Sequence, residues 1–171
     1  MSESKNRKMQ IRKKMSLIEI KKELSCISSI QLLDIIEADS DEVIYYRKQM
    51  EPMHEFDYPK IAVTPFIHDD NQIIEWIFKQ IPVLQDGAVW IMPYGNYGMW
   101  WIKIKILDCI SFVTYLWKNE EELCFIDVKS NQCYEVYWIE DELCFIDVKS
   151  TQCYEVYSVK NEYCIMSKQL E

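Results

Sequence analysis

The sequence predicts an α+β fold in which N-terminal helices pack on a mainly antiparallel β-meander sheet extended by a duplicated hairpin. Up to residue 82, apolar residues recur at helical spacing in several segments. From residue 83 onward, runs of β-branched and aromatic residues alternate with short polar turns, as antiparallel strands do. Within that second part, residues 122–137 and 142–157 are identical except for Asn131 against Thr151.

A chain of 171 residues fits a single domain with its own core. We expect that domain to span residues 15–171, with a helical part at about 15–82 and a β-meander at about 83–167. Residues 1–14 carry six basic groups against one acidic group, a net charge of +5, and form a polar and basic segment with nothing to anchor it to the core. They are therefore expected to form a disordered basic tail.

The helical part is expected to contain three helices and one short strand. The apolar spacing indicates helices at about 16–26 and 30–38, whereas residues 42–50 fit a helix or a strand equally well. Residues 61–64 read as a short strand closed by Pro65. A further helix is expected at 69–80, with Asp69 or Asp70 as its N-cap.

The meander is expected to begin with strands at 88–92, 99–107 and 110–117 and to continue to about residue 166. Within 99–107, Trp101 and two lysines alternate with three isoleucines. Such alternation is typical of a sheet with one buried face and one face in water.

The two copies of the repeat lie 20 residues apart. Repeat arrays generally need about three or more units to bury a continuous core, so two copies and a weak third echo do not predict a solenoid. The pattern instead indicates that one hairpin of an existing sheet was duplicated.

The charge of the chain restricts the kind of partner that it can bind, and its cysteine content restricts the cell compartment in which we expect it. The net charge is −9, and residues 120–171 hold twelve acidic groups and four lysines. This acidity argues against nucleic-acid or anionic-membrane binding and suits a basic partner. Seven cysteines without a CxxC pair, no secretory signal and no apolar run of about 18 residues together predict a cytoplasmic protein with unpaired thiols.

Catalytic and metal-binding motifs are not apparent in the sequence. Neither of the two histidines, His54 and His68, has a spaced partner, and capping explains the aspartates after His68. The glycine-rich segment 93–98 matches no phosphate-binding loop and reads as a hairpin connection. We therefore expect no catalytic residues, cofactor or metal, and a carboxylate-dependent hydrolase is the least favoured reading.

Acidic groups next to tyrosine and tryptophan at the predicted turns are the main functional signal. Acids at turns are usually only solvated, and aromatic residues on strands are usually core, but their combination is typical of protein interfaces. The expected partner-binding residues are Glu120, Glu121, Glu122, Tyr137, Trp138, Glu140, Asp141, Glu142 and Tyr157.

In size, acidity and its aromatic meander of the Cys-Phe-Ile-Asp-Val…Tyr-Glu-Val-Tyr kind, the chain resembles the immunity proteins of bacterial toxin–immunity pairs, including contact-dependent inhibition systems. The resemblance implies a bacterial protein that covers the active cleft of a basic toxin, such as a nuclease. A different reading is a structural or adaptor protein that self-associates through exposed strand edges.

Overall fold

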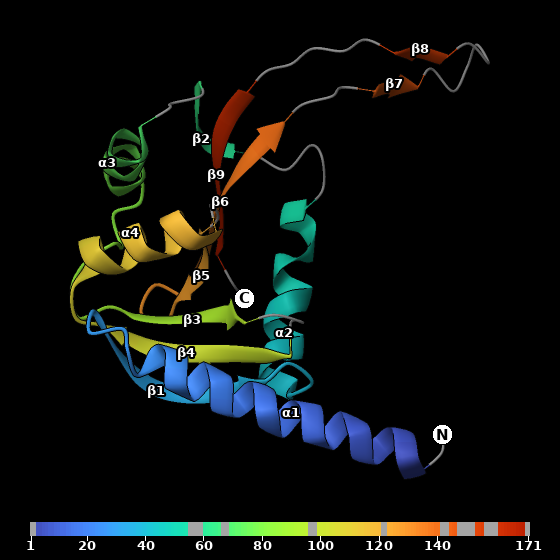
Figure 1. The fold of residues 1–171 in the computed structure, drawn as a ribbon. Coiled ribbons are helices and arrows are strands. Elements are labelled where there is room, and N and C mark those ends of the chain that lie inside the picture. Colours follow the sequence, from blue (N-terminus) through green and yellow to red (C-terminus); the bar gives the residue numbers. More distant parts are fainter. Residues whose placement is uncertain are drawn as a thin grey trace.

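The computed structural model describes residues 3–54, 60–65, 69–95, 99–120, 123–140, 144–146, 153–155 and 161–169. It confirms the α+β fold: a seven-stranded sheet, in which every pairing is antiparallel, is covered by helices (Figure 1). The strand order is β1-β4-β3-β5-β6-β9-β2. The strands are β1 (Ile30–Glu37), β2 (Lys60–Pro65), β3 (Val89–Tyr94), β4 (Trp100–Ile106), β5 (Leu123–Asp127), β6 (Gln132–Glu140) and β9 (Asn161–Gln169). The helices are α1 (Glu3–Leu24), α2 (Asp41–Met50), the short 3₁₀ helix η1 (Glu51–His54), α3 (Asp70–Gln80) and α4 (Cys109–Glu120).

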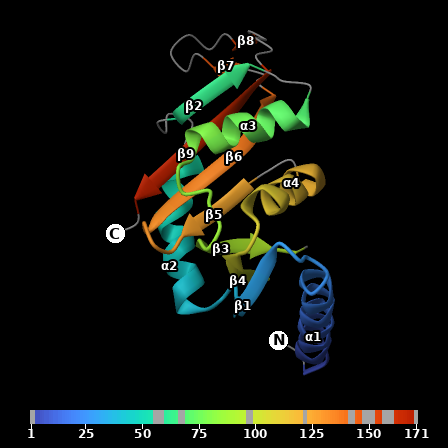
Figure 2. The same cartoon turned by 90° about the vertical axis from the view of Figure 1, so that its left-hand side faces the viewer.

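One face of the sheet packs against α1, α3 and α4 (Figure 2). Trp90 of β3 lies at the centre of this core, with its ring 4.2 Å from that of Phe125 in β5 and 6.0 Å from that of Phe112 in α4. The isoleucines at 102, 104 and 106 of β4 are fully buried on this face. It therefore holds the larger of the two hydrophobic clusters.

The opposite face packs against α2 and η1, so the expectation of one buried face and one wet face is wrong for the centre of the sheet. Val43 and Met50 of α2 and Met53 of η1 form a second cluster with residues of β3, β4, β5 and β6. Because both faces are covered, consecutive residues of a central strand are both buried. Trp90 and Ile91 of β3 are an example. This explains why the central strands read as nearly continuous apolar runs.

The segment 30–38 forms strand β1 and not the expected helix. Its apolar residues form a short run whose spacing fits a helix as well as a strand. The pairing with β4 decides between them: Ile30 to Glu37 lie opposite Ile106 to Trp100, with one irregularity near Asp34. Leu33, which the helical reading would bury, is 45% exposed on this edge strand.

The segment 110–117 forms helix α4 and not the expected strand. Phe112, Val113, Leu116 and Trp117 lie on one helical face and are buried. Asp108 caps the helix, since its carboxylate accepts hydrogen bonds from the backbone N–H and the hydroxyl of Ser111 at 3.0 and 2.7 Å. This capping pattern was the sequence signal that the strand reading overlooked.

Residues 3–14 continue α1 and are not a disordered tail. Lys13 binds the carboxylates of Glu37 and Asp39 at 2.7 and 3.4 Å. Further along α1, the hydroxyl of Ser16 accepts a hydrogen bond from Nε1 of Trp100 at 3.2 Å. These contacts attach the basic part of the helix to the edge of the sheet.

Several other expectations are confirmed. Asp69, one of the two expected N-caps, caps α3. Segment 42–50, for which helix and strand were both left open, is helical, with Ser40 as its N-cap. Strand β2 contains the residues 61–64 expected to form one, while β3 and β4 match the expected strands to within two residues at either end.

The two copies of the repeat occupy different places in the fold. The first copy forms β5 and β6, which lie within the main sheet. In the second copy, β7 (Cys144–Ile146) and β8 (Cys153–Glu155) pair with each other in a separate two-stranded sheet (Figure 1). Strand β6 then pairs with β9 along nine residues.

Asn131, the residue of the first copy that differs from the second, has an unusual backbone conformation. Asn131, in the turn between β5 and β6, has a φ of 52°. Asparagine tolerates this left-handed conformation, whereas β-branched threonine, the residue at 151, does not. The first copy therefore carries the residue that suits the turn in the main sheet.

We predict that Asn131→Thr lowers the free energy of unfolding by about 1–2 kcal/mol, because a β-branched residue is strained at positive φ. Asn131→Gly removes the same side chain without that strain and serves as the matched variant. Urea unfolding monitored by circular dichroism measures both. Equal stability of the two variants would contradict the assigned role of the backbone conformation.

Candidate functional site

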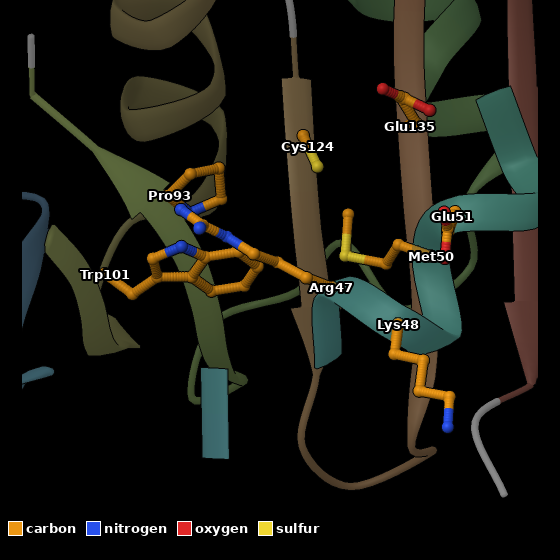
Figure 3. A pocket seen from close by; sticks show the side chains of 8 residues that line it. All are labelled: Arg47, Lys48, Met50, Glu51, Pro93, Trp101, Cys124 and Glu135. Carbon is orange, nitrogen blue, oxygen red and sulfur yellow. The ribbon is translucent and has the colours of Figure 1, made fainter. Parts of the chain in front are cut away.

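A pocket of about 610 Å³ opens on the face of the sheet that packs against α2 (Figure 3). One wall comes from the end of α2 and the start of η1, and the floor comes from four adjacent strands. Its lining residues are Arg47, Lys48, Met50, Glu51, Pro93, Trp101, Cys124 and Glu135.

The floor is a row of side chains that crosses the sheet at right angles to the strands. Trp101 of β4 is paired with Pro93 of β3, and Cys124 of β5 is paired with Glu135 of β6. Strands β3 and β5 are neighbours, so these two pairs form one continuous row. Pro93 and Cys124 are small and stand between two larger residues, which accounts for the hollow.

Trp101 closes one end of the row. It is only 3% exposed, and its ring stacks on that of Tyr46 with centroids 6.4 Å apart and an interplanar angle of 16°. Its Nε1 is buried and has no hydrogen-bond acceptor among the residues that the structure describes. A buried N–H without an acceptor costs about 1–3 kcal/mol.

The two basic side chains of α2 that line the pocket point in different directions (Figure 3). Arg47 extends toward Pro93 and the indole nitrogen of Trp101, whereas Lys48 points away from them. Glu135 lies beyond Cys124 at the other end of the row and is 6% exposed. The pocket therefore has a guanidinium at one end, a buried carboxylate at the other and an apolar middle.

A second candidate site is defined by backbone positions at the end of the sheet where β5 begins and β6 ends. Glu120 is the last residue of α4, three residues before β5 begins at Leu123. Leu123 pairs with Val136, and β6 continues beyond this pair through Tyr137 and Trp138 to Glu140, all paired with β9. The fold thus brings Glu120, Tyr137, Trp138 and Glu140 to the same end of the sheet, although they lie on different elements.

The other five expected partner-binding residues fall outside the residues that the structure describes. They are Glu121, Glu122, Asp141, Glu142 and Tyr157.

Sequence reasoning did not identify the pocket residues as a site. Arg47 and Trp101 are far apart in the sequence and meet only because α2 crosses the sheet over β4. The one signal was Glu135, a charged residue with apolar and aromatic neighbours on both sides, Cys133 and Tyr134 before it and Val136 and Tyr137 after it. Buried charges of this kind are rare unless they are paired or functional.

Two serine hydroxyls donate to a carboxylate at 2.7 Å, Ser111 to Asp108 and Ser130 to Asp127, and each pair is a local contact between residues three apart, in a helix cap or a turn. Burial, together with the charges of Asp86 and Asp108, raises the pKa of the Cys109 thiol to about 12. His54 ends η1, and His68 lies outside the described residues. Within the described ranges, no group of three or more histidine, cysteine, aspartate or glutamate residues is placed to hold a metal ion.

Comparisons with protein-family models, with curated proteins and with solved structures gave no match. Among the described residues, the helices are all too short or too polar to cross a membrane.

We predict that Cys109 reacts far more slowly with a thiol reagent than the exposed Cys26. At pH 8, a pKa of about 12 in place of 9.0 leaves a roughly thousandfold smaller fraction of reactive thiolate. Labelling with Ellman's reagent, followed by peptide mass spectrometry, measures the two rates. Unfolding in urea is the control, since it should bring the two rates together. Equal labelling in the native protein would contradict the burial of Cys109.

Proposed function

We propose that the chain is a protein-binding module that binds and neutralises a basic protein through the acidic, aromatic end of its sheet. The observation that carries the proposal is that the backbone positions of Glu120, Tyr137, Trp138 and Glu140 lie at one end of β5 and β6. Carboxylates beside large aromatic residues combine electrostatic attraction with apolar anchors.

The distribution of charge supports this proposal. The whole chain carries a net charge of −9, and residues 120–171 account for −8, from twelve acidic groups and four lysines. α1 is the most basic element and lies at the other edge of the sheet, beside β1 (Figure 1). An approaching basic protein is therefore drawn toward the end where β6 meets β9.

The class of partner that we infer is a bacterial toxin with a basic substrate-binding cleft, such as a nuclease. The carboxylates of the immunity protein would then take the place of the phosphates that the cleft binds. In this proposal the protein acts in the cytoplasm of the toxin-producing bacterium and uses no cofactor.

Self-association is a second candidate, supported by the edge strands. β1 and β2 are the outer strands of the sheet, and β1 runs for eight residues with Leu33 exposed. An edge of this length offers unpaired backbone groups to another copy. A molecular mass that rises with concentration would favour this candidate over binding of a toxin.

Affinity capture from a lysate of the native host, at low and high salt, tests the proposed function. The expected result is one basic protein that is retained at low salt and released at high salt, because screening weakens the attraction. The captured protein should be a toxin whose activity is lost in the complex. Retention of an acidic protein, or of a basic protein that stays fully active in the complex, would contradict the proposal.

We predict that Glu120→Lys combined with Glu140→Lys slows association with the captured basic protein by about tenfold, because rim charges act mainly on the association rate. Glu19→Lys on α1 combined with Asp34→Lys on β1 serves as the control: this pair also replaces two acidic residues by lysine, and so makes the same change of charge, at exposed sites away from β6 (Figure 1). Stopped-flow or surface-plasmon measurements at two salt concentrations give the rates. An equal effect of this control pair would show that only net charge matters.

A further inference from the structure

The pocket under α2 has features of a ligand site that binding of a basic protein does not explain. Its volume of about 610 Å³ lies within the range of pockets for small molecules. It presents Arg47 at one end, which is unfavourable for a cationic side chain. A ligand of this pocket must suit both of its ends.

The end at Trp101 requires a hydrogen-bond acceptor. Its buried Nε1 has none among the described residues, and the side chain of Arg47 extends toward this nitrogen (Figure 3). An oxygen that accepts from the indole N–H would therefore also lie near the guanidinium. Two donors, one of them cationic, select an anionic oxygen over a neutral one.

A comparison with Trp90 shows that the unsatisfied N–H alone does not indicate a ligand. The Nε1 of Trp90 is also buried without an acceptor among the described residues. However, Trp90 lies on the opposite face among the rings of Phe112 and Phe125. Of these two tryptophans, only Trp101 lines the pocket, together with Arg47.

The rest of the pocket limits the size and charge of the ligand. The row from Trp101 to Glu135 crosses three strand spacings, about 14 Å in total. Pro93, Cys124 and Met50 give its middle an apolar lining. Two acidic residues, Glu51 and Glu135, line the far end, so a ligand with one carboxylate at the Trp101 end fits this lining better than a ligand with an anionic group at each end.

We propose that this pocket binds a small organic monocarboxylate, with its carboxylate between Arg47 and the indole N–H of Trp101 and its apolar body over Pro93, Cys124 and Met50. The site does not depend on the acidic end of the sheet, and its ligand has the opposite charge to the proposed protein partner.

Nuclear magnetic resonance of the full chain, labelled with ¹⁵N, tests the proposal at the indole nitrogen itself. The chain has six tryptophans and therefore six indole N–H signals. Trp101→Phe and Trp90→Phe identify two of them. The probes are acetate, benzoate and 3-phenylpropanoate, with the neutral amide 3-phenylpropanamide as the uncharged counterpart of the last.

The expected result is a saturable shift of the Trp101 signal with 3-phenylpropanoate, a smaller response to acetate and no saturable shift with the amide. The Trp90 signal should stay in place, because it lies on the other face of the sheet. No saturable response of Trp101 to any of the three carboxylates would overturn the proposal, as would an equal response to the amide.

A pair of neighbouring variants tests the role of the guanidinium. Arg47→Gln should weaken binding of 3-phenylpropanoate about tenfold, as expected for loss of a charge-assisted hydrogen bond. Lys48→Gln removes the same charge from the next residue, whose side chain points away, and should change the affinity by less than about twofold. Both residues are exposed, so neither variant should unfold the protein. Equal losses in the two variants would reduce the effect to net charge and overturn the assignment of Arg47.

Discussion

Burial of the central strands on both faces is the constraint on which the rest of this structure depends. In β3 and β4, adjacent residues such as Trp90 and Ile91, or Trp101 and Ile102, point to opposite faces and are both buried. A shift of register by one residue would exchange the two faces and place each side chain in the wrong cluster. The helices must therefore cover both sides, with α2 on one and α1, α3 and α4 on the other.

The same constraint explains how the pocket arises. The α2 face is closed over Val43 and Met53, where large side chains meet the helix. Along the row from Trp101 to Glu135, the intervening residues are proline and cysteine, and neither fills the space beneath the end of α2. The hollow is thus a local interruption of an otherwise closed interface between helix and sheet.

In the described part of the chain, the second copy of the hairpin adds no strand to the main sheet. The first copy has partners on both sides, β3 next to β5 and β9 next to β6. The described strands of the second copy pair only with each other. The difference between Asn131 and Thr151 gives a physical reason for this assignment, because only the first copy has a residue suited to the left-handed turn.

The sequence predicted those parts of the fold that local signals determine. α3 has a capping aspartate, a buried face at helical spacing and a proline shortly after its end, and it was predicted correctly. β1 was not, because Leu32 to Ile36 fit a helix or a strand and only pairing with β4 decides. α4 was misread because its run of apolar and aromatic residues resembled a strand, although Asp108 supplied a cap.

The two candidate sites also differ in how far the sequence could predict them. Acidic and aromatic residues adjacent in the sequence could be recognised as a possible surface before the fold was known. Structure added that Glu120 and Glu140 reach the same end of the sheet. The pocket was not predictable, because Arg47, Trp101 and Glu135 come from distant segments and meet only through the packing of α2 on the sheet.

Hydrogen–deuterium exchange of the complex with the captured basic protein tests the central functional claim most directly. The account predicts slower exchange at the start of β5 and at the end of β6, around residues 123–125 and 137–140, with little change in α1. Protection confined to α1 or to the edge strand β1, with the end of β6 unchanged, would contradict the assignment of the acidic end as the binding surface.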